Sequence, residues 1–136
     1  MSLKLYNTMG KKIEDFIPIN KNIVGFYGCG PTVYKAAHIG NLRAYVFQDI
    51  LARALNFLGY DVKHVMNITD IGHLSDDGDD GEDKMLKSAR ESGLKVNQIA
   101  DMYIDLFFKD VDSLNIKRPS IVCRATEHIV DMIELI

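Results

Sequence analysis

Residues 22–66 read NIVGFYGCGPTVYKAAHIGNLRAYVFQDILARALNFLGYDVKHVM, and this segment indicates how the chain folds. Residues 22–27 form a compact apolar run that ends at a glycine-rich loop, as a buried parallel strand does. Residues 41–59 separate apolar from polar side chains with a period near 3.6, which predicts a helix ending at Gly59. Residues 61–66 predict a second strand. We therefore expect a βαβ unit with a right-handed connection.

The flanking segments extend this unit. Residues 3–7 alternate apolar and polar side chains, and residues 11–16 can pair with them as a β-hairpin. Residues 82–92 and 96–114 show helical patterns, and the second carries an apolar stripe of the kind that usually packs into a core. Beyond Pro119, we expect a last helix that begins near residue 126, with Thr126 as its N-cap.

Composition fits a single globular domain with an uneven charge. The chain has 136 residues, of which 47% are hydrophobic, and its formal net charge is −3. Six acidic residues lie in 76–83, within a segment (67–83) that is typical of a polar loop, so the remainder carries +3. A mildly basic remainder permits an anionic ligand without identifying one.

Other compositional signals bear on the surroundings of the protein. No apolar run approaches the roughly 20 residues of a membrane-spanning helix, and the N-terminus lacks the apolar stretch of a signal peptide. We therefore expect a cytoplasmic protein that does not bind a membrane. Its two cysteines, Cys29 and Cys123, are far apart and indicate no disulfide framework.

The loop between the first strand and the long helix holds the residues suited to chemistry. Ligands of open α/β sheets bind at such loops, and a helix N-terminus there attracts phosphate. Two common phosphate motifs do not match. Gly25 and Gly30 have the spacing of a P-loop, but Pro31 replaces its lysine. Gly28 and Gly30 begin a dinucleotide fingerprint, but Val33 occupies its third glycine position.

His38 and Asn41 remain as candidates. They lie three residues apart at the helix start, so one helix face would carry both side chains toward a ligand held by the helix dipole. Gly40 would let a flat or bulky group approach the backbone. Taken alone, a histidine at a helix start is more often structural than functional.

Four ordered blocks of sequence are more specific. They are YGCGPTVY at 27–34, HIGNLR at 38–43, LGY at 58–60 and NITD at 67–70, accompanied by RP at 118–119 and RAT at 124–126. Together they closely resemble the cysteinyl-tRNA synthetase family of class I aminoacyl-tRNA synthetases, over essentially the whole chain. The related cysteine ligase of mycothiol synthesis usually has Pro where this chain has Val33, which favours the synthetase.

The resemblance implies an α/β fold: the N-terminal half of a Rossmann-like (HUP-type) nucleotide-binding catalytic domain, with a parallel sheet and flanking helices. Residues 1–136 would stop before the family's connective insertion, without the lysine-rich KMSKS half and without an anticodon-binding domain. The implied parent activity is ATP-dependent activation of L-cysteine to cysteinyl-adenylate, followed by transfer to tRNA-Cys. We expect the isolated chain to be inactive in this reaction and able to self-associate through an exposed sheet edge.

The resemblance also implies roles for single residues. His38 and Asn41 match the first and last residues of the signature that holds ATP, so they are the expected catalytic residues. Asn41 stands where that signature has histidine, so it can donate a hydrogen bond but cannot be cationic. Cys29 matches the first ligand of a Zn²⁺ ion that binds the substrate thiolate, with the other ligands expected outside this chain. The expected set that binds Mg-ATP and cysteine is Gly30, Thr32, His38, Gly40, Asn41 and Thr69.

Several alternatives stay open at this point. The chain could be a stand-alone ATP-binding or adenylate-binding regulatory module, or part of a cysteine:amino-sugar ligase of the mycothiol type. The remaining titratable candidates match no zinc position of the family, so we expect core or surface roles for them; they are His64, His73, His128 and Cys123.

Overall fold

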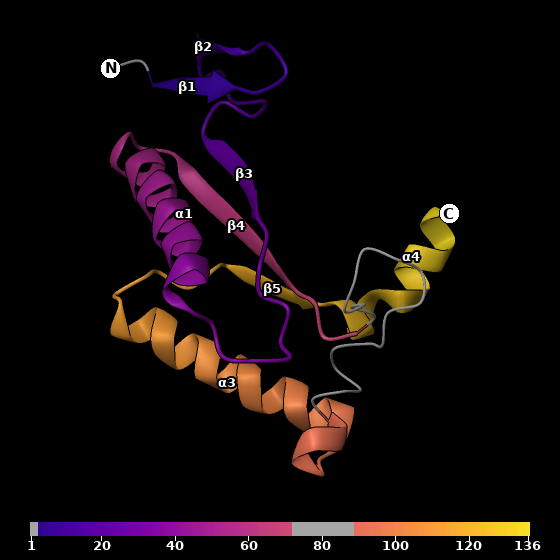
Figure 1. Cartoon of the computed structure of the whole chain (residues 1–136). Helices are drawn as coiled ribbons and strands as arrows, with labels where there is room; N and C mark the ends of the chain where they lie inside the picture. The colour runs from indigo at the N-terminus through magenta and orange to yellow at the C-terminus, as the bar shows by residue number, and fades with distance from the viewer. Residues whose placement is uncertain (1–2, 72–88) are drawn as a thin grey trace.

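The computed structural model describes residues 3–71 and 89–136 (Figure 1). An antiparallel hairpin of β1 (Lys4–Asn7) and β2 (Lys12–Asp15) begins the chain. It stands at one end of the molecule, beyond the start of the next strand. The hairpin predicted from alternating side chains is therefore confirmed.

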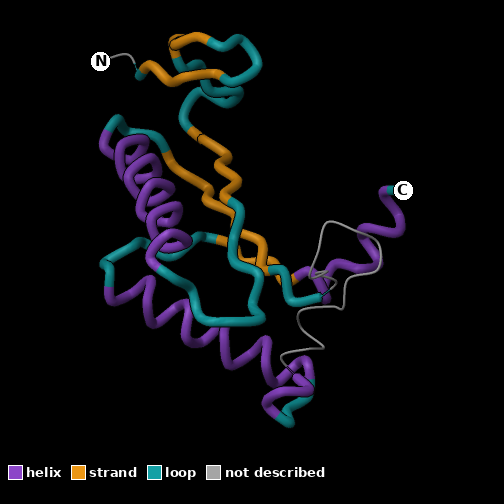
Figure 2. The backbone as a smooth tube through the Cα atoms, in the orientation of Figure 1, coloured by secondary structure: helices purple, strands orange, loops and turns teal. Residues whose placement is uncertain are grey.

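A parallel sheet forms the centre of the fold, with strand order β3–β4–β5. Its strands are β3 (Ile23–Gly28), β4 (Asp61–Ile68) and β5 (Ile121–Arg124). The helix α1 (Ile39–Phe57) connects β3 to β4, and these strands pair in parallel with Ile23 opposite Asp61. This is the predicted βαβ unit. Figure 2 shows the three strands side by side, with the two long helices on one side of them.

The core lies on one face of this sheet. In β4, His64, Met66 and Ile68 are buried, and they alternate with half-buried residues. Met66 packs in one cluster with Tyr45 of α1 and with Phe107 of α3 (Val96–Ser113), so both helices cover the same face. Because side chains alternate along a strand, Asn67 and the adjoining Thr69 belong to the opposite face, at the carboxyl end of the sheet.

The C-terminal segment differs from its prediction. β5 is an additional strand, and Ala125–His128 form a 3-10 helix before α4 (Ile129–Leu135). His128, not Thr126, is the N-cap of α4. The predicted cap is wrong because the Thr126 hydroxyl donates instead to the buried Asp70 carboxylate, at 2.7 Å.

The segment that follows the second predicted strand is described only in part. β4 runs to Ile68, so it takes two residues of the segment predicted as loop. The acidic run at 76–83 and most of the helix predicted at 82–92 lie outside the described residues. No helix among the described residues is long and apolar enough to cross a membrane.

The buried His64 makes the fold sensitive to acid. Its ring stacks on Phe26 with centroids 4.6 Å apart, and its Nε2 has no hydrogen-bond partner among the described residues. Burial lowers the pKa of His64 below its ordinary value, and the nearby Asp49 carboxylate offsets this only in part. The fold therefore favours the neutral imidazole.

Acidification from pH 7 to 5 is expected to destabilise the chain through His64. The unfolded chain takes up a proton near pH 6.5, whereas the folded chain takes it up only at lower pH, so stability falls as pH drops through this window. The slope for one proton is at most about 1.4 kcal/mol per pH unit. Urea unfolding of the chain and of its His64→Phe variant should give a flatter pH dependence for the variant; equal slopes would contradict the assignment.

Candidate active site

The start of α1 presents two hydrogen-bond donors. His38 is the N-cap, and its Nδ1 accepts from the backbone N–H groups of Gly40 (3.1 Å) and Asn41 (3.4 Å). Because Nδ1 acts as the acceptor, a neutral His38 carries its proton on Nε2. The Asn41 Oδ1 accepts from the His38 N–H at 3.1 Å, so its Nδ2 is the end that remains to donate.

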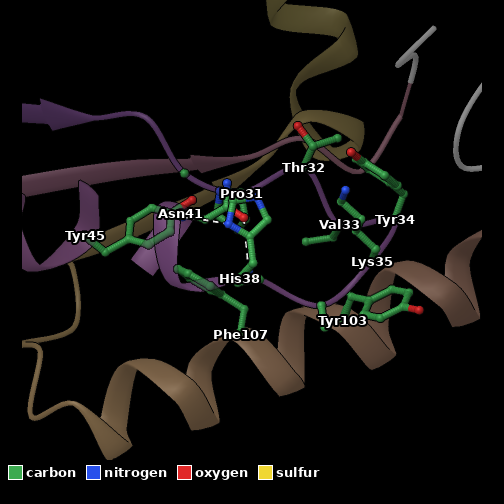
Figure 3. Close-up of a pocket in the computed structure, with 13 residues that line it drawn as sticks. Pro31, Thr32, Val33, Tyr34, Lys35, His38, Asn41, Tyr45, Tyr103 and Phe107 are labelled. Atoms are coloured by element: carbon green, nitrogen blue, oxygen red, sulfur yellow. Dashed lines mark hydrogen bonds between the residues drawn. The ribbon is translucent and has the colours of Figure 1, made fainter. Parts of the chain in front are cut away.

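These donors border a cavity of about 240 Å³ between the loop and α3 (Figure 3). Four of the residues expected from the sequence line it: Gly30, Thr32, His38 and Asn41. Lys35 of the same loop also lines the cavity. A helix N-terminus, two side-chain N–H donors and a lysine suit an anionic group such as phosphate. Cys29, Gly40 and Thr69 are not among the residues that line this cavity.

Aromatic side chains from two helices form part of the cavity lining, and the sequence did not reveal them. Tyr45 comes from α1, and Tyr103 and Phe107 come from α3. The rings of Tyr45 and Phe107 meet edge to face, with centroids 4.8 Å apart. Burial, with a smaller contribution from Cys29, raises the pKa of Tyr45 to about 12, so its hydroxyl stays protonated. The apolar stripe on α3 predicted a core role, which Phe107 also has.

The loop joins the carboxyl end of β4 as a short extension of the sheet. Thr32 and Thr69 form a parallel bridge. The Val33 N–H donates to the Thr69 carbonyl at 3.1 Å, and the Thr69 N–H donates to the Pro31 carbonyl at 3.0 Å. Two threonines from segments 37 residues apart are thus brought together beside the Cys29–Gly30 turn.

The Cys29 thiol is exposed, and the turn that carries it is fixed through its backbone. The Cys29 carbonyl accepts from the Gln48 Nε2 of α1 at 3.0 Å. Within residues 3–71 and 89–136, no three His, Cys, Asp or Glu side chains gather closely enough to hold a metal ion. Tetrahedral zinc needs three or four protein ligands, so these residues do not form a zinc site by themselves.

Asp70, which follows the carboxyl end of β4, binds the end of β5 and the 3-10 helix after it. Its carboxylate is buried and accepts from Arg124 Nε (2.9 Å), from the Thr126 N–H (3.0 Å) and from the Thr126 hydroxyl. Burial alone would raise the pKa of Asp70, but the hydrogen bonds from Thr126 and Arg124 outweigh it and hold the pKa below its ordinary value. Arg124 also pairs with Asp101 of α3 at 2.8 Å. This network fixes the position of β4 relative to β5 and α3 at their site end.

The family model and the curated proteins that match this chain all belong to one group of enzymes. The family described as "tRNA synthetases class I (C) catalytic domain" matches residues 15–136. The cysteine–tRNA ligase of Treponema denticola is 68% identical over all 136 residues, which cover 28% of that protein. Cysteine–tRNA ligase 1 of Burkholderia lata is 52% identical and the ligase of Treponema pallidum (strain Nichols) 54%; the chain covers 29% and 26% of them. The chain thus spans little more than a quarter of the length of these curated relatives.

Proposed function

The chain belongs to the cysteinyl-tRNA synthetase family, and on that premise we propose that it supplies part of the ATP and cysteine site of an ATP-dependent cysteine–tRNA ligase. The observation that carries the proposal is the paired presentation of His38 and Asn41 donors at the N-terminus of α1, beside a 240 Å³ cavity. In this proposal residues 1–136 are the N-terminal half of the catalytic domain. The KMSKS half and the anticodon-binding domain belong to a longer protein.

The donors at the start of α1 suit the charge that develops on ATP during activation. A carboxylate oxygen of cysteine attacks the α-phosphorus of ATP and forms a new O–P bond. The bond from this phosphorus to the oxygen that bridges to the β-phosphate breaks, and pyrophosphate leaves. His38 Nε2–H and Asn41 Nδ2–H each donate to phosphate oxygens without themselves becoming ionised. A Cβ at Gly40 would lie 3.0 Å from the His38 Cε1, so a glycine here leaves the His38 ring room to cap the helix. Mg²⁺ accompanies ATP as part of the substrate.

The Cys29–Gly30 turn and the two bridged threonines form the proposed amino-acid side of the site. Thr32 and Thr69 offer hydroxyl groups at the carboxyl end of the sheet. Cys29 supplies one exposed thiol, a preferred zinc ligand, and the remaining ligands must come from outside the described residues. When bound, zinc would polarise the substrate thiol and favour cysteine over serine. The partners of the full ligase are then ATP, L-cysteine and tRNA-Cys.

A chimeric ligase tests this proposal. The 136 residues replace the part of the Treponema denticola ligase that they match, and cysteine-dependent ATP–pyrophosphate exchange is measured. We expect exchange within about tenfold of the parent ligase, and a loss of at least about a hundredfold in the His38→Ala chimera, because a donor to the developing charge is removed. The isolated chain should show no exchange. An inactive unsubstituted chimera that folds would contradict the proposed function.

The zinc assignment has its own readout in the same chimera. Replacing Cys29 by serine should reduce bound zinc from about one ion per molecule to well below one after dialysis, because an alcohol oxygen is a much poorer zinc ligand than a thiolate. Metal content is measured by atomic emission. Cys123→Ser is the matched control, because Cys123 is the other free cysteine among the described residues. This variant should retain the ion. Full zinc occupancy in the Cys29→Ser protein would remove Cys29 from the ligand set.

A further inference from the structure

The Asn67 side-chain amide joins two parts of the amino-acid side of the site, the Cys29–Gly30 turn and Thr69. Its Oδ1 accepts from the Tyr27 hydroxyl at 2.9 Å and from the Gly30 N–H at 3.0 Å. Its Nδ2 donates to the Thr69 hydroxyl oxygen at 3.1 Å. Asn67 of β4 therefore binds both the Cys29–Gly30 turn and Thr69.

The direction of this amide follows from its partners. A backbone N–H can only donate, so the atom of Asn67 that faces Gly30 must be the carbonyl oxygen. The NH₂ end then faces Thr69. Two backbone hydrogen bonds also hold Thr69 in place, because its N–H donates to the Pro31 carbonyl and its carbonyl accepts from the Val33 N–H.

This direction determines what the Thr69 hydroxyl can offer a ligand. An oxygen that accepts from Asn67 Nδ2 keeps its own proton on another side. Among the described residues, no hydrogen bond takes up that proton. The half-buried Thr69 hydroxyl is therefore held as a donor, and the Gly30 N–H is occupied by Asn67 and withheld from the ligand.

We propose that Asn67 is a positioning residue that holds the Thr69 hydroxyl as a donor to an acceptor atom of the bound amino acid. The inference rests on the proposed function, in which the amino acid binds beside Thr69. It predicts that substitution of Asn67 weakens the binding of cysteine through Thr69. The binding of ATP should change little, because its expected contacts lie at the start of α1.

The test uses Asn67→Asp in the chimeric ligase. Aspartate has the same shape and still accepts from Tyr27 and Gly30, but it cannot donate to Thr69. The Thr69 hydroxyl then donates its proton to the carboxylate at position 67. It can therefore no longer donate a hydrogen bond to the substrate. We expect the KM for cysteine to rise about tenfold or more, with the KM for ATP within about twofold, because one hydrogen bond to a charged ligand is lost.

Two further variants separate positioning from a structural role. Tyr27→Phe removes the other bond to the same amide and leaves Thr69 untouched, so its kinetics should match those of the unsubstituted chimera. In a Thr69→Val background, Asn67→Asp should raise the KM for cysteine no further, because the group through which it acts is absent. Thermal melting of each variant monitors folding.

Each outcome decides the inference. A rise confined to the KM for cysteine that disappears in the Thr69→Val background supports it. Additive effects in that background, equal losses for ATP and cysteine, or a variant that unfolds would assign Asn67 a structural role and overturn it. An inactive unsubstituted chimera would contradict the proposed function itself, whereas an active chimera with an unchanged Asn67→Asp variant would contradict only the role of Asn67.

Discussion

Replacing Asp70 by asparagine is expected to lower the free energy of unfolding by about 3 kcal/mol. The Asp70 side chain is only 1% exposed and receives hydrogen bonds from three donors on Arg124 and Thr126. Asparagine turns one of its two terminal atoms into a donor, so at least one of these groups faces another donor or goes unpaired. Arg124 also loses the buried charge that neutralises it. Urea unfolding monitored by circular dichroism measures the difference.

Asp112→Asn is the matched control for this prediction. Asp112 also forms a two-point pair with an arginine, Arg118, at 2.9 and 2.6 Å, but both side chains are more than half exposed. Water screens that pair, so the control should change stability little. A similar loss for both substitutions would show that burial of Asp70 does not determine its contribution.

The pH dependence gives a second check on Asp70. Its folded-state pKa lies below the ordinary value, so its stabilisation is present above about pH 4 and is lost as pH falls through the lowered pKa. The unfolding free energies of the chain and of the Asp70→Asn variant should therefore converge in acid. A constant difference down to pH 2 would indicate that the carboxylate charge is not the cause.

The elements that the sequence predicted are those whose pattern is local. α1 and β4 each contain enough residues for a period to be visible, and the hairpin is closed within twelve residues. β5 has four residues, and its strand conformation depends on pairing with β4, where Val65 lies opposite Ile121. Thr126 appeared to be a helix cap because its true partner, Asp70, is 56 residues away in the sequence.

The same distinction applies to the site. That His38 and Asn41 lie together at a helix start could be predicted, because capping and the helix dipole are local properties of one helix start. Tyr103 and Phe107 carry no sequence signal for a cavity, since an apolar stripe at helical spacing predicts a core equally well. Asn67 was visible only as part of a motif. Its bond to Gly30 joins segments 37 residues apart, and only the parallel pairing of β3 with β4 brings them together.

Replacing Gly30 by alanine is expected to destabilise the chain by about 3 kcal/mol and to disrupt the site. A Cβ at this position would overlap the Asn67 carbonyl oxygen and would lie 2.7 Å from Met66 Cγ. A backbone oxygen of β4 cannot move aside as a side chain can, so the loop must shift away from the strand. That shift would break the Gly30–Asn67 bond and the bridge between Thr32 and Thr69.

Gly25→Ala provides the control that isolates this close approach. Gly25 lies in β3, and a Cβ there would meet no atom within 4 Å. Its substitution should be neutral or slightly stabilising, because alanine restricts the unfolded chain more than glycine does. Urea unfolding compares the two variants, and the chimeric ligase with Gly30→Ala should lose cysteine-dependent exchange while that with Gly25→Ala retains it. If both alanines left stability unchanged, the loop would not be held against β4, and the bridge between Thr32 and Thr69 could not position two hydroxyl groups for an amino acid.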